Sequence, residues 1–332
     1  MGDSRYSGQG RPCPEYPFKS NLPRANWLIL QEKADNIMQK SFSNRAVIFS
    51  LVIPGLVIFV FAVLAPILLS VYYGMTNYTG IGKHSFLGFK NYQDILTDDP
   101  VFWKSLFHAI ILGLGFILLQ HPVAIFFAAM LDKLGGKSEK LFRTVYFIPC
   151  VISVVVTSAL WVNIYNSDYG FLNKVLGMLG LGFLKQQWLG DPNTALGSML
   201  FIIIWQGFGW AFLIYYAGLK GIPGELHEAA RIDGATGFKV YTRIILPLLS
   251  PVIKVNVTLA MISALKQMET VFRTTNGGPG DTTQFLANYL YIRAFNNYEL
   301  GYGSAISVLF VIICLLVTYL FNKYINSDVG EF

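Results

Sequence analysis

The chain alternates between long apolar runs and shorter polar stretches. A membrane-spanning helix needs about 20 predominantly apolar residues, and six runs reach that length. They lie at roughly 46–74, 102–131, 142–166, 195–220, 247–272 and 301–324. Helices are the expected form of such runs, because every backbone polar group in a bilayer must be bonded within the protein. The pattern therefore predicts an all-α fold, a polytopic membrane helix bundle of about six transmembrane helices.

The composition agrees with a membrane protein and argues against several other classes. Hydrophobic residues make up 54% and charged residues 13% of the chain, and the mean hydropathy is +0.49. Soluble domains carry about 25% charged residues. The three cysteines and four histidines are scattered, so they suggest neither a disulfide framework nor a metal-ligand cluster. Because no nucleophile motif is present either, we expect neither a metal site nor enzyme chemistry on this chain.

The lysines and arginines predict how the chain is oriented in the membrane. The N-terminal tail, the second and fourth loops and the C-terminus together carry sixteen of them, and the opposite loops carry seven. Cytoplasmic loops are enriched in these residues, so we expect both termini in the cytoplasm. The expected organisation is a cytoplasmic tail at 1–45, a transmembrane domain at 46–325 and a second cytoplasmic tail at 326–332.

A polar segment at 223–243 separates the fourth and fifth apolar runs, and the topology places it in the cytoplasm. Pro223 suits the first turn of a helix, and Gly234 suits the left-handed end of one. The stretch FKVYTRII then restarts a helix, and Pro247 redirects the chain into the fifth run. We expect two short helices joined by a turn, although an ordinary loop with local caps would carry the same features.

A longer pattern favours a specific role for this segment. The pattern is E-A-A, three residues, G, nine residues and I-x-L-P, and the chain meets it without departure. The matching residues are Glu228, Ala229, Ala230, Gly234, Ile244, Leu246 and Pro247. This resembles the cytoplasmic coupling motif of permease subunits of ATP-binding-cassette (ABC) importers, whose coupling helix docks in a groove on the ATPase. The resemblance implies that these residues, together with Asp233, form the contact with an ATPase subunit.

The resemblance extends to the carbohydrate-uptake branch of these importers, which includes permeases for maltose, lactose, glycerol-3-phosphate and alginate oligosaccharides. This resemblance rests on two stretches, AGLKGIPGELHEAARIDGA and residues 275–307, and the similarity covers roughly 46–325. It implies a bacterial inner-membrane subunit that pairs with a second permease and binds two ATPase subunits. A solute-binding protein would deliver the carbohydrate from outside. The large extracytoplasmic insertion of the maltose-type subunit is missing. The stretch ALKQMETVF is also more charged than the aromatic and amide-rich run expected there in that branch.

The chain shows no nucleotide site of its own. The stretch LDKLGGKS at 131–138 is half of a phosphate loop, but that motif needs glycine where Leu131 stands. It also lies in a basic loop between two apolar runs rather than after a strand. We therefore expect no cofactor on this chain, with Mg-ATP bound and hydrolysed by the partner ATPase subunits.

Polar residues in the fifth run are candidates for the substrate path, because such residues are costly inside a membrane and commonly functional. On a continuous helix, the spacing of 7, 4 and 3 residues would place one set on a single face. That set is Asn256, Ser263, Gln267 and Thr270. In one interpretation this face lines a polar cavity and bonds sugar hydroxyls, and the adjacent Glu269 is a further candidate for the path. In the other, Glu269 pairs with Lys266 and Arg273 in a structural cluster at the end of the helix.

Aromatic residues in the fourth run are weaker candidates. Trp205, Trp210 and Tyr215 could stack on sugar rings, or they could simply pack the bundle or sit at an interface. Gly207 and Gly209 beside them would permit close helix contact.

A different class of protein, an ion-coupled secondary carrier or channel, would instead use the charges of the fifth run. The absence of inverted hydropathy repeats argues against it.

Overall fold

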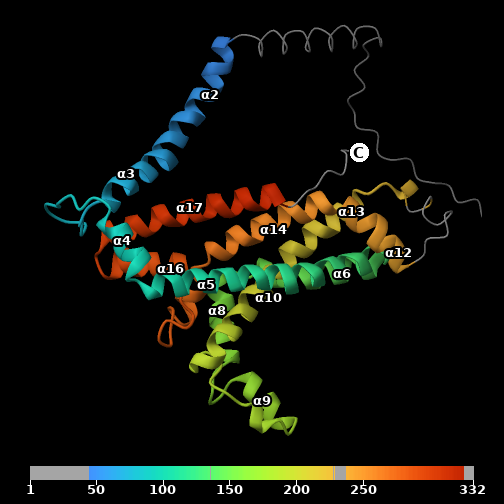
Figure 1. The fold of residues 1–332 in the computed structure, drawn as a ribbon. Helices are drawn as coiled ribbons and strands as arrows, with labels where there is room; N and C mark the ends of the chain where they lie inside the picture. Colours follow the sequence, from blue (N-terminus) through green and yellow to red (C-terminus); the bar gives the residue numbers. More distant parts are fainter. Residues whose placement is uncertain (1–44, 135, 227, 229–236, 325–332) are drawn as a thin grey trace, which may run out of the picture. The chain divides into compact units, whose positions relative to one another are not determined.

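The computed structural model describes residues 45–134, 136–226, 228 and 237–324. The chain divides into two compact units, Met1–Pro66 and Ile67–Phe332. In its described part the first unit is helical, consisting of α2, the π-helical turn η1 that follows it and the first two residues of α3. The second unit contains the helix bundle, and both candidate sites described below belong to it (Figure 1).

Helices make up almost all of the regular structure among the described residues. The first half has α2 (Arg45–Phe59), η1 (Val60–Leu64), α3 (Ala65–Gly74), α4 (Lys90–Thr97), α5 (Pro100–Gly115), η2 (Phe116–Gln120), α6 (His121–Asp132), α7 (Gly136–Val151), α8 (Val154–Ile164) and α9 (Phe171–Met178). The second half has η3 (Gly182–Leu184), α10 (Pro192–Lys220), α12 (Phe238–Val240), η4 (Tyr241–Ile245), α13 (Leu246–Leu248), α14 (Ser250–Leu265), α15 (Glu269–Thr274), α16 (Leu286–Tyr291), η5 (Ile292–Asn296) and α17 (Leu300–Tyr324). The all-α prediction is confirmed.

Four described helices are long and apolar enough to cross a membrane: Val47–Gly74, Pro100–Asp132, Pro192–Lys220 and Leu300–Tyr324. Two further pairs of helices pass the same test but are bent. Gly136–Val151 and Val154–Ile164 meet at 92°, and Tyr241–Leu248 and Ser250–Thr274 meet at 63°. The described chain thus has up to six spans, in the six predicted places, but the third and the fifth are not straight helices.

The span predicted at 142–166 is present as a bent pair of helices, because the chain turns sharply between α7 and α8. Ser153 is extended there, and its hydroxyl accepts a hydrogen bond from the amide of Val156 at 3.4 Å, which caps the start of α8. The carbonyl of Ile152, freed by the turn, accepts a hydrogen bond from the side-chain amide of Gln206 at 3.1 Å. A break inside a membrane protein persists where neighbouring helices bond the freed backbone groups, as α10 does here.

Three prolines inside the spans each follow a π-helical turn. Pro66, Pro122 and Pro247 lie two residues after the ends of η1, η2 and η4. A proline has no amide hydrogen and crowds the carbonyl four residues before it. In all three cases that carbonyl lies within the π-helical turn, whose wider i→i+5 bonding accommodates it. In each case the residue just after the π-helical turn donates its amide to the first carbonyl of that turn, and helix resumes directly after the turn.

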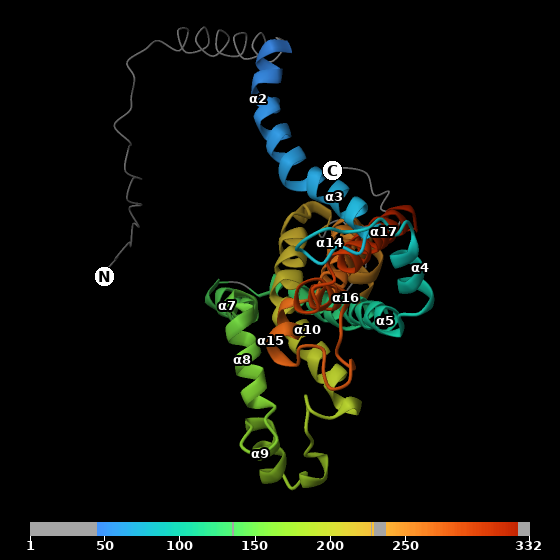
Figure 2. The same cartoon turned by 90° about the vertical axis from the view of Figure 1, so that its left-hand side faces the viewer.

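The second unit is built around α10. Figure 1 shows α17, α14 and the continuous α5–η2–α6 helix lying lengthwise beside one another, and α10 packs against α6 and α7. Figure 2 shows α8 and α9 extending away from this group. At Gly209 a Cβ atom would lie 2.8 Å from the carbonyl oxygen of Tyr146 and 2.9 Å from the sulfur of Cys150. The prediction that Gly209 permits close helix contact is therefore confirmed.

Candidate functional site

The coupling segment predicted at 223–243 is described only in part. Residues 224–226 and Glu228 are helical, and Glu228 is exposed. Ala229, Ala230, Asp233 and Gly234 lie outside the described residues. At the other end of the motif Ile244 and Leu246 are half-buried, and Pro247 is exposed.

Ile245 fixes this end of the segment to the bundle. It is only 3% exposed and packs in one core with Leu219 of α10 and Leu249. The coupling motif leaves this position unspecified, so the motif did not single it out. The apolar pair at 244 and 245 was the available signal, because η4 presents one of the two residues to the core.

Polar side chains join three helices beside this segment. The ammonium of Lys220 at the end of α10 lies 3.0 Å from the carboxylate of Asp132 at the end of α6. The hydroxyl of Tyr216, one turn earlier on α10, donates a hydrogen bond to the carboxylate of Glu139 on α7. These contacts hold α6, α7 and α10 together at the end of the bundle where the coupling segment begins.

The fifth span is interrupted where the sequence predicted a continuous polar face. Helix α14 ends at Leu265 and α15 begins at Glu269, so the three residues between them are not helical. The four predicted residues therefore do not share one face. Asn256 is 5% exposed and donates a hydrogen bond to the carbonyl of Ala211 on α10 at 3.4 Å, whereas Ser263 is exposed. Gln267 lies in the interruption and is half-buried.

The charged residues of the fifth span do not form the predicted structural cluster. Lys266, Glu269 and Arg273 are all described, all are exposed, and no ion pair joins any two of them. The i,i+3 and i,i+4 spacings that favoured pairing hold only on an unbroken helix. The break at Leu265 removes the first of these spacings.

The aromatic candidates of the fourth span have different surroundings. Tyr215 is fully buried, and its hydroxyl lies 2.8 Å from Nδ1 of His121, so it packs the bundle. Trp205 is half-buried against Trp161, with ring centroids 5.3 Å apart. Trp210 is 61% exposed. Of the three rings, only those of Trp205 and Trp210 present a surface that another molecule could contact.

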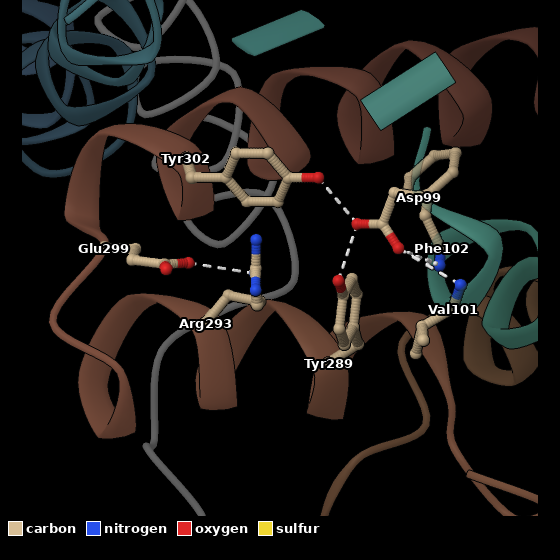
Figure 3. Close-up of polar contacts among 7 residues, drawn as sticks. All are labelled: Asp99, Val101, Phe102, Tyr289, Arg293, Glu299 and Tyr302. Atoms are coloured by element: carbon tan, nitrogen blue, oxygen red, sulfur yellow. Dashed lines mark hydrogen bonds and ion pairs between the residues drawn. The ribbon is translucent and has the colours of Figure 1, made fainter. Parts of the chain in front are cut away.

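A second candidate site lies at the opposite end of the bundle, around Asp99 (Figure 3). One carboxylate oxygen of Asp99 accepts hydrogen bonds from the amides of Val101 and Phe102 at 3.1 and 3.0 Å, which caps the start of α5. The other accepts hydrogen bonds from the hydroxyls of Tyr289 and Tyr302, both at 2.6 Å. A single carboxylate thus joins α5, α16 and α17.

A cavity of about 860 Å³ adjoins this carboxylate and is lined by residues of α4, α16, α17 and the loop after α3. The guanidinium of Arg293 forms an ion pair with Glu299 at 3.0 Å and lies 4.3 Å from the ring centroid of Tyr302. Burial and the adjacent Asp99 raise the pKa of Tyr289 well above its usual value. The hydroxyl of Tyr289 therefore remains a hydrogen-bond donor throughout the physiological pH range.

Sequence reasoning missed this cluster. The signal available was the dipeptide Asp99-Pro100 directly before an apolar run, which is typical of a helix start. That signal predicts the cap but not the tyrosines, which come from far along the chain. The described residues include no group of side chains that could hold a metal ion. The geometry of the cluster fits a structural role or the binding of a polar molecule.

The up to six apolar spans among the described residues define a multi-pass helical protein of the kind that crosses a membrane. Residues 120–331 match the model of the family described as the binding-protein-dependent transport system inner membrane component. The chain belongs to this family.

Its relatives are permeases. The chain is 34% identical over 290 residues to a probable ABC transporter permease protein of Bacillus subtilis, YurN, covering 87% of this chain and 99% of the relative. It is 33% identical over 257 residues to the multiple sugar-binding transport system permease protein MsmF of Streptococcus mutans, covering 77% and 87%. The expected resemblance to the carbohydrate-uptake branch of ABC permeases is confirmed.

A solved structure shares the fold. The crystal structure of a bacterial ABC transporter involved in the import of the acidic polysaccharide alginate matches with a TM-score of 0.74 at 20% identity. The match covers 88% of this chain and 99% of that chain. It supports the assignment of the helical bundle to the permease fold.

Proposed function

We propose that this chain is a permease subunit of an ATP-driven importer and forms, with a second permease, the path for a carbohydrate, specifically an oligosaccharide. A solute-binding protein delivers the substrate, and two separate ATPase subunits bind and hydrolyse Mg-ATP. The observation that carries this proposal is the similarity over 87% of the chain to an ABC permease, within a family named for binding-protein-dependent transport. Relatives named for sugars support the substrate class.

The coupling segment is proposed to face the cytoplasm and to dock on one ATPase subunit. The excess of lysine and arginine on that side of the chain supports this orientation, with both termini in the cytoplasm. The exposure of Glu228 leaves its carboxylate available to a partner, while the burial of Ile245 ties the segment to the bundle. A push on the segment would therefore be transmitted to α10 and α14.

The translocation path is proposed to run along the interrupted fifth span. Non-helical backbone at membrane depth is tolerated only where protein covers it or where it lines a water-filled cavity. The exposed Lys266 and Glu269 on either side of Gln267 fit the second situation. Trp205 and Trp210 remain candidates for contact with a sugar ring. Closure of the ATPases would shift the bundle between inward- and outward-open populations.

The coupling proposal is tested in proteoliposomes that contain this chain, its partner permease, the ATPase subunits and the binding protein. Glu228→Lys and Gly234→Trp are each expected to abolish the stimulation of ATP hydrolysis by delivered substrate, and uptake with it. Glu225→Lys is the matched control, because Glu225 is an exposed glutamate in the same segment but outside the motif. Normal stimulated hydrolysis and uptake in the first two variants would refute the coupling role.

The same vesicles separate the importer from an ion-coupled carrier. Uptake is expected to require ATP on the side of the ATPases and to be unaffected by collapse of ion gradients. Uptake driven by an ion gradient without ATP would instead favour the carrier, with the charges of the fifth span as its coupling site. A panel of labelled mono- and oligosaccharides presented with the binding protein then tests the substrate class.

A further inference from the structure

An apolar groove of about 580 Å³ lies between α6 and the η4–α13 segment, and we call it the α6–η4 groove. On the α6 side, Pro122, Phe126 and Met130 follow one another at intervals of four residues, which places them on one face of the helix. All three are exposed. Tyr241 and Leu246 form the opposite wall. The apolar surface of the groove is therefore open along its length within the described part of the chain.

The length of the groove matches one leaflet of a bilayer. From Pro122 to Lys133 the helix rises about 16 Å, at about 1.5 Å per residue. Half of a hydrocarbon layer of about 30 Å is about 15 Å. The ion pair between Asp132 and Lys220 lies at the common end of two candidate spans, and because charges are costly inside the hydrocarbon we place the membrane surface at that end. The groove thus extends from that surface to about the middle of the membrane.

The end of the groove at the membrane surface is cationic. Lys133 lines it and is exposed, and its ammonium lies 5.6 Å from the ring centroid of Tyr241. Among the described residues Lys133 has no ionic partner, because the carboxylate of the adjacent Asp132 pairs with Lys220. The hydroxyl of Tyr241 is buried and has no hydrogen-bond partner in the described part of the chain. A cation and an unused hydroxyl donor together favour the binding of an anion at this end of the groove.

We propose that the α6–η4 groove binds an anionic phospholipid. One acyl chain lies against Pro122, Phe126 and Met130, and the phosphate accepts hydrogen bonds from Lys133 and Tyr241. The apolar wall of the groove explains why an acyl chain binds there, and the charge of Lys133 explains the preference for an anionic headgroup. The lipid would contact both α6 and η4, and so would join the bundle to the segment that follows residue 236. This proposal depends on neither the transported substrate nor the partner ATPase.

The test is lipid binding to the purified complex in detergent micelles, measured by native mass spectrometry. The two probes are dioleoylphosphatidylglycerol and dioleoylphosphatidylcholine, which share acyl chains and differ in headgroup charge. We expect preferential retention of phosphatidylglycerol. Lys133→Gln should weaken its binding about fivefold, the effect of one lysine near an anionic headgroup, and should leave phosphatidylcholine unchanged. Tyr241→Phe, which removes only the hydroxyl, should weaken it by two- to fivefold.

Two controls keep the outcome specific. Lys137→Gln removes a nearby exposed lysine that does not line the groove and should change binding less than twofold. Lys133→Arg keeps the charge and should retain phosphatidylglycerol, which shows that position 133 tolerates substitution.

Equal binding of the two lipids, or unchanged binding in Lys133→Gln, would overturn the proposal. So would full displacement of the lipid by inorganic phosphate, which would indicate a phosphate site rather than a lipid site. Binding by the separate chain but not by the assembled complex would show that another protein segment covers the groove, and would overturn it as well.

Discussion

Replacement of Asp99 by alanine is expected to destabilise the protein more than any neighbouring surface change. The carboxylate is 8% exposed and accepts four hydrogen bonds, two from backbone amides and two from tyrosine hydroxyls. Loss of a helix cap costs about 1 kcal/mol, and each buried hydroxyl left without a partner costs about 1–3 kcal/mol. Relief of the buried charge offsets part of this cost. We therefore expect Asp99→Ala to lower the free energy of unfolding by about 3 kcal/mol.

The variant Asp99→Asn separates the contribution of the helix cap from that of the two tyrosine hydrogen bonds. The asparagine oxygen still caps α5, but its NH2 group can only donate, so the two tyrosine hydroxyls lose their acceptor and we expect a loss of about 1 kcal/mol. Asp98→Ala is the matched control, because Asp98 is the adjacent, exposed aspartate, and its change should stay within about 0.5 kcal/mol. Unfolding is measured in mixed micelles with a rising fraction of SDS, followed by tryptophan fluorescence. Labelling of the half-buried Cys150 and Cys314 provides a second probe.

A double-mutant cycle with Tyr302→Phe tests whether the carboxylate and the hydroxyl act together. Residues that share a hydrogen bond should show a coupling energy above about 0.5 kcal/mol. The reasoning is refuted if Asp99→Ala costs no more than Asp98→Ala. It is also refuted if the effects of Asp99→Ala and Tyr302→Phe simply add.

Four further outcomes are expected in the same assay. Gly209→Leu should lower the free energy of unfolding by about 3 kcal/mol or more, because the added atoms would meet backbone. Gly207→Ala, where a Cβ would meet only a side chain at 3.5 Å, should cost less than about 1 kcal/mol. Gln206→Leu should cost about 1 kcal/mol by leaving the carbonyl of Ile152 without its donor. The stability advantage of wild type over Tyr289→Phe should be constant below pH 10 and should shrink above it. Above pH 10 the tyrosine of the unfolded chain ionises, at a pKa of about 10, while Tyr289 in the folded protein, with its raised pKa, stays protonated. A stability advantage that persisted unchanged above pH 10 would contradict this prediction.

The positions of the spans could be predicted from the sequence, because the length of an apolar run reports directly whether a helix can cross the membrane. The close approach at Gly209 could be predicted for a similar local reason. The interruption after Leu265 could not, because residues 266–268 contain neither proline nor glycine, and tertiary contacts decide where the helix ends. The Asp99 cluster was also out of reach, because Tyr289 and Tyr302 lie 190 and 203 residues away in the sequence.

The structure also changes which polar residues of the spans are candidates for the substrate path. Three side-chain amides within or beside apolar helices each donate to a backbone carbonyl of a neighbouring segment. The pairs are Gln120 to Gly207, Gln206 to Ile152 and Asn256 to Ala211, at 3.1, 3.1 and 3.4 Å. Each pair has one member on α10, so α10 is held to three other parts of the bundle by these bonds. The rule that an intramembrane polar residue is functional by default therefore does not single out these amides as path residues, since a structural bond already accounts for each.

The residues around the break in the fifth span are better candidates for the substrate path. Lys266 and Glu269 are exposed, and within the described chain neither forms an ion pair. A charge without a partner is costly at membrane depth unless water or a second protein reaches it. Asn256 is bonded to α10, whereas the side chains of Lys266 and Glu269 form no hydrogen bond or ion pair within the described chain, so movement of the bundle should change the surroundings of Lys266 and Glu269 more than those of Asn256. Glu269, which the sequence already suggested, and Lys266 are therefore stronger candidates for the path than Asn256.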